Sequence, residues 1–314
     1  MIRSSYLTTL LAIVLCFATS ASAQVTLKAK YPDGRSTTVV QQSKLAQTLK
    51  LKVSGMEIDQ STGAEQTMTV TVVNGKRAND GTLIVKAKIN AIKAALSMPG
   101  GVELEFDSSD PDADPPGTAF DAYLDIFKAT LNSTWTTTMN KDNRVVDIKG
   151  REAAFSDLPQ SLQDNMKSQL DPEYLKTVAN DELDRLPSTP VSSGDSWERT
   201  NLVRFEAGQH FTFTTKYTYK GSIEKDGKKL ENIVFQVTDV VYDSDADSPV
   251  KVLESDLKVA KSEGMILFDL AAGQIVLEHS KVRLTGSLKL EANGLEIPAD
   301  LDLTIEANSR LKIK

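Results

Sequence analysis

Cysteine is almost missing from this 314-residue sequence. Cys16 is the only one, so the rest of the chain cannot form a disulfide bond, a thiolate metal site or a cysteine nucleophile. Histidine is nearly as rare, with His210 and His279 alone, and neither has a nucleophile or a metal ligand at motif spacing. The sequence also lacks a Gly-x-Ser-x-Gly elbow, a Walker loop, a His-Glu-x-x-His helix and a dinucleotide-binding fingerprint. We therefore expect a protein that is not an enzyme.

Positive charge is in deficit. The chain has 36 Lys and Arg against 43 Asp and Glu, and a formal net charge of −7. The basic residues stand singly at alternating positions, as in Lys50 and Lys52, and they are not gathered with aromatic residues, which make up only 6% of the chain. A nucleic-acid partner is therefore not expected.

A long apolar run occurs only at the N-terminus. Arg3 provides a basic start, residues 7–17 an apolar core, and residues 21–23 (Ala-Ser-Ala) a small-residue cleavage site. This pattern predicts a signal peptide over residues 1–23 with cleavage after Ala23, a periplasmic or secreted protein, and no transmembrane segment after cleavage. Leu15 before Cys16 departs from lipoprotein signals, which disfavours a lipid anchor.

Alternating apolar and polar residues dominate the rest of the chain, and a period of two indicates strands with one buried face. The alternation predicts strands in both halves of the chain. Its apolar positions are Leu49, Leu51 and Val53; Met68, Val70 and Val72; Leu83, Val85, Ala87 and Ile89; Phe211 and Phe213; Tyr217 and Tyr219; Ile233, Phe235 and Val237; Ile275 and Leu277; and Leu301, Leu303 and Ile305.

The turn dipeptides favour antiparallel hairpins, because Asn-Gly and Asp-Gly suit positive φ angles. Four such dipeptides occur, at Asn74-Gly75, Asp80-Gly81, Asp226-Gly227 and Asn293-Gly294. Helical spacing of apolar residues predicts two interruptions, a helix over about 118–131 and a helical region over about 156–185 in which Asp171-Pro172 restarts a helix.

These patterns predict a mainly β (α+β) fold: a large curved antiparallel sheet or half-barrel built from two similar halves, with a helical insertion in the middle. We expect an N-terminal β half over 24–150 with one helix near 118–131, a helical segment and linker over 151–194, and a C-terminal β half over 195–314.

Two acidic loops share the pattern Asp-x-Asp-Ala-Asp-x-Pro, beginning at Asp110 and at Asp243. Alternate carboxylates can converge on Ca²⁺, so the second loop predicts a calcium site. Its candidate metal ligands are Asp243, Asp245, Asp247 and Glu254. However, Ser248 stands where an EF-hand loop needs glycine. The alternative is that these residues simply form soluble turns that protect sheet edges. Apart from Ca²⁺, we expect no cofactor.

Two short motifs carry a family resemblance, one formed by Pro190, Gly194, Asp195 and Trp197 and one by Gly264, Phe268, Asp269 and Gly273. With this layout the chain resembles an exported bacterial domain family of unknown function. Its architecture is similar to that of LolA-like periplasmic lipid and lipoprotein carriers, in which a curved antiparallel sheet holds acyl chains under helices.

That resemblance implies a cell-envelope protein that binds a lipid or another apolar ligand in a β half-barrel without catalysis. Alternating apolar residues look alike in a packed core and in a lipid-lined cavity. The sequence therefore leaves open a structural or protein-interaction module of the envelope, stabilised by calcium, whose protein partner it does not identify.

Overall fold

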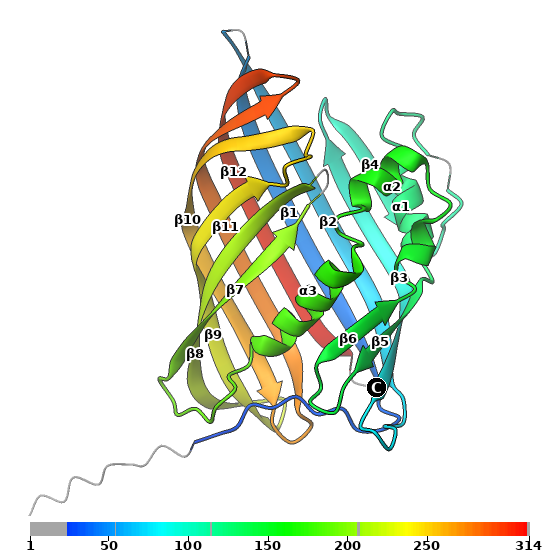
Figure 1. Cartoon of the computed structure of the whole chain (residues 1–314), viewed down its shortest axis with the longest axis vertical. Coiled ribbons are helices and arrows are strands. Elements are labelled where there is room, and N and C mark those ends of the chain that lie inside the picture. The colour runs from blue at the N-terminus through cyan, green and yellow to red at the C-terminus, as the bar shows by residue number, and fades with distance from the viewer. Residues whose placement is uncertain (1–23, 54, 114, 206–207, 313–314) are drawn as a thin grey trace, which may run out of the picture.

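The computed structural model describes residues 24–312 except 54, 114, 206 and 207 (Figure 1). The predicted signal peptide therefore lies outside the described residues. Within the described residues, six strands precede the main helical segment and six follow it. The elements are β1 (Ser36–Val53), β2 (Met56–Asn74), β3 (Leu83–Met98), β4 (Val102–Asp107), α1 (Ala122–Thr130), β5 (Thr134–Met139), β6 (Val145–Lys149), the 3₁₀ helix η1 (Glu152–Phe155), α2 (Gln160–Met166), α3 (Pro172–Asp184), β7 (Ser196–Arg204), β8 (Gln209–Lys225), β9 (Lys228–Ser244), β10 (Val250–Asp269), β11 (Gln274–Ala292) and β12 (Leu295–Lys312).

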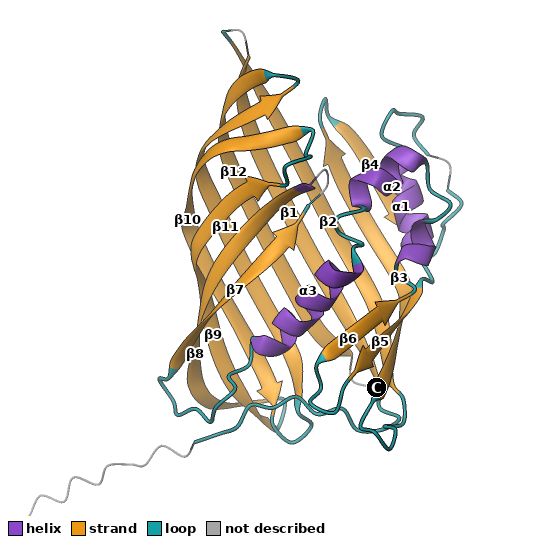
Figure 2. Cartoon of the chain, in the orientation of Figure 1, coloured by secondary structure: helices purple, strands orange, loops and turns teal. Residues whose placement is uncertain are grey.

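All twelve strands belong to one open, curved antiparallel sheet (Figure 2). Its order is β6-β5-β3-β2-β1-β12-β11-β10-β9-β8-β7, and β4 pairs with β3 beside this path. The predicted fold class is thereby confirmed. The first and last strands, β1 and β12, pair at the centre, with partners running from Thr38 opposite Lys312 to Leu51 opposite Ala299.

Because β1 and β12 meet in the middle, the two edge strands β6 and β7 are consecutive in the sequence. The helical insertion connects them. In Figure 1, α3 lies across the open side of the sheet between the edges, while α1 and α2 lie over the N-terminal strands. The insertion thus covers the concave face where the sheet does not close on itself.

Side-chain alternation places apolar residues on the concave face. In β3, Leu83, Val85, Ala87 and Ile89 are buried while the lysines between them are exposed. Strands β10 and β11 approach closely at Gly286, where φ is +155° and an added Cβ would lie 2.0 Å from the carbonyl oxygen of Asp256.

Two of the four predicted turn dipeptides form tight hairpins. Asp226-Gly227 joins β8 to β9 and Asn293-Gly294 joins β11 to β12, all four residues with positive φ. The other two dipeptides separate β2 and β3, which also pair antiparallel, but no two-residue turn joins these strands. Asn74 is the last residue of β2, because it is still paired with Val85 and its side-chain amide donates to the carbonyl oxygen of Pro32, whereas Gly75 and Asp80-Gly81 lie in the longer connection to β3.

The helices agree with their sequence signals, with one change of boundary. Helix α3 begins as predicted, since the Asp171 carboxylate accepts a 2.8 Å hydrogen bond from the backbone N–H of Tyr174 and Pro172 follows the cap. Helix α1 begins at Ala122, four residues later than predicted. The Asp121 carboxylate accepts from the backbone N–H groups of Gly117 and Thr118, which holds that segment in a turn.

Candidate ligand cavity

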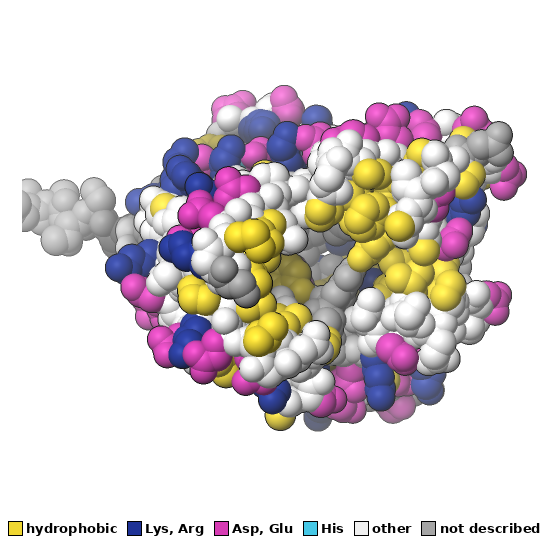
Figure 3. Space-filling model, turned by 90° about the horizontal axis from the view of Figure 1, so that it is seen from above, with side chains coloured by type: hydrophobic (Ala, Val, Ile, Leu, Met, Phe, Trp, Pro, Cys, Tyr) yellow, Lys and Arg dark blue, Asp and Glu magenta, His cyan; other side chains and the backbone are white. Residues whose placement is uncertain are grey.

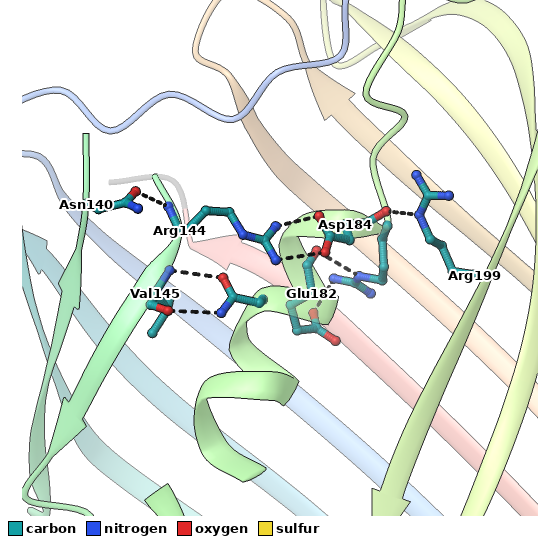
Figure 4. A network of polar contacts seen from close by, with 8 residues as sticks. Asn140, Arg144, Val145, Glu182, Asp184 and Arg199 are labelled. Carbon is teal, nitrogen blue, oxygen red and sulfur yellow. Dashed lines mark hydrogen bonds and ion pairs between the residues drawn. The ribbon is translucent and has the colours of Figure 1, made fainter. Parts of the chain in front are cut away.

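Helix α3 is hydrogen-bonded to the edge strand β6 through one side chain. The Asn180 amide accepts a 3.0 Å hydrogen bond from the N–H of Val145 and donates a 3.0 Å hydrogen bond to its carbonyl oxygen (Figure 4). It therefore replaces a neighbouring strand at this residue. Arg144 adds a bidentate pair to Asp184 at 2.6 and 3.0 Å. Together these contacts satisfy and cover an edge that would otherwise be open to pairing with another chain.

The opposite edge strand, β7, is joined to the same helix. The Tyr174 hydroxyl accepts a 2.9 Å hydrogen bond from the backbone N–H of Arg204, and the Trp197 indole donates a 2.8 Å bond to the carbonyl oxygen of Arg185. Arg199 donates to the carbonyl oxygen of Asp184 at the C-terminal end of the helix (Figure 4). Helix α3 thus bridges both edges of the sheet.

Two faces of α3 serve the two halves of the sheet. Leu175, Ala179 and Leu183, spaced by four residues, pack against the core of β3, β5 and β6. Tyr174, Val178 and Glu182, offset from them by one position, line the space in front of the C-terminal strands. Helix α3 therefore both bridges the two edges and covers a hollow in front of the C-terminal strands.

This hollow, called here the main cavity, has a volume of about 440 Å³. That size is typical of small-molecule sites, which occupy roughly 300–1,000 Å³. The walls are largely apolar and aromatic and come from α3 and from strands β1 and β7 to β12. Apolar and aromatic residues of these walls are Leu45, Tyr174, Val178, Leu202, Val203, Phe205, Phe213, Tyr217, Phe235, Val237, Val282 and Ile305.

A three-member ion cluster lies at one end of the main cavity. Arg185, which follows α3, contacts Glu182 of the helix at 2.5 Å and Glu278 of β11 at 2.5 Å. The side chains of Arg185 and Glu278 are 17% and 19% exposed, whereas 57% of the Glu182 side chain is accessible. Because Glu182 lines three adjoining hollows, that accessible surface faces the interior space of the sheet.

Burial shifts the ionisation of this cluster. Desolvation raises the pKa of Glu182, and the charge of Glu278 adds to the effect, against the opposing influence of Arg185. Burial works against the charge of Arg185, but the two carboxylates keep its pKa above the ordinary value. Desolvation also raises the pKa of the Tyr217 hydroxyl beside the cluster to about 12. Perturbed groups in a hollow of this size mark a candidate binding site.

One end of the curved sheet is apolar on its inner side. Figure 3 shows hydrophobic side chains surrounding an opening at the end of the molecule that carries the β1–β2 and β11–β12 hairpins. Ile58 is paired with Leu51 and Met56 with Val53, so these residues continue the concave face to the hairpin tip. Met56 and Leu295 are 64% and 62% exposed. An apolar surface thus leads from the rim into the sheet.

The structure does not bring the four predicted calcium ligands together. Asp243 is the last residue but one of β9, and Asp245 follows the strand, with Arg204 3.7 Å and His210 3.8 Å from the Asp245 carboxylate. Glu254 lies on β10, 3.8 Å from Lys289. In the described part of the chain, no group of three or more His, Cys, Asp or Glu side chains is placed to hold a metal ion. Calcium binding by Asp243, Asp245, Asp247 and Glu254 stays a prediction.

The two histidines lie apart in the sheet, with β9 and β10 between their strands. His210 faces Asp245, whereas Nδ1 of His279 is 2.7 Å from the Asn308 side-chain oxygen. Neither histidine lines the main cavity.

The motif residues behind the family resemblance have structural contacts around the cavity. The Asp195 carboxylate accepts from the N–H of Ser192, and Trp197 stacks on Tyr217 at 5.8 Å. Gly264 lies under the Phe235 ring, where a Cβ would come within 2.3 Å of a ring carbon. These motifs hold the end of α3 and one cavity wall. Sequence reasoning missed Glu182, Arg185 and Glu278, because Arg185 and Glu278 are 93 residues apart and no local pattern joins them.

Comparison with known proteins confirms the resemblance to a family of unknown function. Residues 80–230 match the model described as "Family of unknown function (DUF6263)". No protein of curated function matches the chain. Among the described residues, no helix is long and apolar enough to cross a membrane.

Three solved structures illustrate the structural likenesses. A structure titled for lipid-protein interactions in lipovitellin has a TM-score of 0.44 and 10% identity over 90% of this chain, which spans only 26% of that chain. A DUF1329 family protein from Desulfovibrio piger and an outer membrane lipoprotein-sorting protein domain from Vibrio parahaemolyticus each have a TM-score of 0.15 and 8% identity, over 83% of both chains. The lipoprotein-sorting domain is the type of neighbour expected from the sequence, but likenesses this weak carry no argument about function.

Proposed function

We propose that this protein is an exported, non-catalytic binding protein of the bacterial envelope that holds a lipid or another apolar molecule in the main cavity. Export is inferred from the basic, apolar and small-residue pattern of residues 1–23. The proposal is carried by one observation, the hollow of about 440 Å³ with apolar walls between α3 and the C-terminal strands.

The arrangement of the roof supports this function. Helix α3 packs its Leu175 face on the N-terminal strands but leaves Tyr174 and Val178 facing the hollow. A helix that served only to cover the edges would be expected to fill that space, because protein interiors pack as densely as organic crystals. The exposed apolar residues Met56 and Leu295 extend the apolar concave face to the rim of the sheet.

The test begins with native mass spectrometry of the full chain purified from its own envelope, followed by organic extraction of the same sample. A bound mass that disappears on extraction supports the proposal and identifies the ligand class. A bare polypeptide that also fails to bind an apolar fluorescent probe would overturn it and favour a structural or partner-binding module.

A pair of variants locates the bound molecule. Val178→Trp places an indole in the main cavity and should abolish probe binding, because the added ring occupies the space between α3 and the sheet. Val241→Trp is the matched control, since Val241 is 52% exposed and does not line the main cavity. Equal binding by both variants would place the ligand elsewhere.

A further inference from the structure

The ion cluster gives the main cavity a polar end, and the net charge of this end is negative. Resting on the proposed function, we propose that the ligand is an amphiphile with a cationic head group, such as an alkylammonium, which lies against Glu182 and Glu278 while its chain occupies the apolar part of the main cavity. The argument uses the charge balance, the positions of the basic groups and the aromatic walls.

The cluster contains two carboxylates and one guanidinium, so with all three ionised it has a net charge of −1 inside a largely apolar hollow. Uncompensated charge in such surroundings is unfavourable, and a bound cation would balance it. Each carboxylate uses one oxygen for Arg185. Within the described residues, Oε1 of Glu182 and Oε2 of Glu278 have no hydrogen-bond partner, which leaves two acceptors for an ammonium group.

The basic residues around the cavity are already paired. Arg185 is held between its two carboxylates, and Lys281 contacts Glu306 at 3.1 Å. Arg199 donates to the carbonyl oxygens of Asp184 and Glu198. An anionic head group such as a fatty-acid carboxylate would therefore meet two carboxylates without a free base, and we expect the cavity to disfavour it.

The cavity walls supply a second, independent observation. The rings of Tyr217, Phe235 and Phe213 line the same hollow, and Tyr217 and Phe235 are in contact with ring centroids 5.3 Å apart. Aromatic faces attract cations through their quadrupole, and this attraction increases when water is excluded. Carboxylates beside aromatic rings are suited to an organic cation, whereas a fatty-acid carboxylate gains nothing from the rings.

The experiment compares three single-chain ligands of equal length. Dodecylamine, dodecanol and dodecanoate are used to displace an apolar fluorescent probe from the delipidated full-length protein at pH 7.5, below their micelle concentrations. We expect dodecylamine to displace the probe at a concentration about tenfold lower than dodecanoate, with dodecanol between them. Equal potency, or stronger binding of dodecanoate, would overturn the head-group proposal and leave the proposed function intact. Failure of all three ligands and of the probe would overturn the proposed function itself.

Charge-neutral variants link the selectivity to the cluster. Glu182→Gln and Glu278→Gln should each reduce the preference for dodecylamine over dodecanoate at least about threefold, about 0.65 kcal/mol. Glu296→Gln is the matched control, because Glu296 and Glu254 flank Lys289 on the outer surface as Glu182 and Glu278 flank Arg185 inside. A preference that is unchanged in both cavity variants, with melting temperatures showing that they are folded, would also overturn the proposal.

Discussion

Removal of the Asn180 side chain is the sharpest test of the way in which α3 closes the sheet. In Asn180→Ala, the N–H and carbonyl groups of Val145 each lose a 3.0 Å hydrogen bond. Val145 is only 7% exposed, so water replaces these bonds poorly. The helix retains its Leu175, Ala179 and Leu183 contacts, which confines the perturbation to the edge strand.

The expected loss follows from these two groups. Leaving one buried polar group without its partner costs about 1–3 kcal/mol. For two groups with partial access to water, we expect Asn180→Ala to lower the free energy of unfolding by about 2–4 kcal/mol. Asn180→Asp should cost less, because its carboxylate can still accept from the Val145 N–H although it faces the Val145 carbonyl oxygen.

Urea unfolding measures the loss, and hydrogen exchange locates it. The urea midpoint should be lower in Asn180→Ala than in wild type. Relative to wild type, hydrogen exchange should accelerate more at the Val145 amide than at amides of the central strand β1. Asn90→Ala is the control, since the exposed Asn90 amide donates to Thr71 on the sheet surface and its loss should stay within about 0.5 kcal/mol. A loss in Asn180→Ala no larger than in this control, with unchanged protection at Val145, would refute the bridging role.

Three further predictions concern the cluster, the cavity wall and the acidic loop. The raised pKa of Glu182 means that stability from its protonated form is present below the ordinary Glu value of 4.5 and is lost as pH rises through the folded-state value. The stability of wild type relative to Glu182→Gln should therefore fall as pH rises above 4.5, and parallel urea-midpoint profiles would contradict this. Gly264→Ala should cost about 1–3 kcal/mol in urea unfolding, because the new Cβ forces the Phe235 ring to move, and a loss under about 0.5 kcal/mol would show that the ring shifts freely. If the acidic loop binds Ca²⁺ as the sequence predicts, millimolar Ca²⁺ should raise the melting temperature and a chelator should reverse the rise; equal melting temperatures with and without chelator would remove the predicted site and leave the Asp245 carboxylate to its neighbours Arg204 and His210.

The strands and the helical insertion could be predicted from the sequence because their signals are local. In β3, a buried apolar residue alternates with an exposed lysine from Val85 to Ile89, and this period is visible without any knowledge of the neighbouring strands. The same holds for the Asp171 cap of α3 and for the Asn293-Gly294 turn, where the backbone angle itself selects the residue types.

The cavity and its ion cluster could not be predicted because they depend on long-range pairing. Glu278 faces the hollow only because β11 pairs with β12 and β12 with β1, which places Glu278, Ser309 and Gln41 in one row on the concave face. Arg185 reaches this row because the indole N–H of Trp197, on β7, donates a hydrogen bond to its carbonyl oxygen and holds its backbone in place. In the sequence, Glu182 and Arg185 look like an ordinary solvent-exposed helix pair with i, i+3 spacing.

One helix therefore both bridges the edges and forms the cavity wall, and this has a consequence for ligand exchange. Asn180 holds α3 to β6, while Glu182 and Val178 on the same helix face the main cavity. A ligand that contacts α3 and the C-terminal strands binds the bridged state better than a state in which the helix has left β6, so ligand binding and bridging must stabilise each other. By the same linkage, Asn180→Ala should raise the dissociation constant of the ligand by the factor by which it lowers the population of the bridged state. This effect is expected although Asn180 does not itself line the main cavity. Unchanged affinity in a variant that has demonstrably lost the β6 contact would mean that the cavity forms without the bridge.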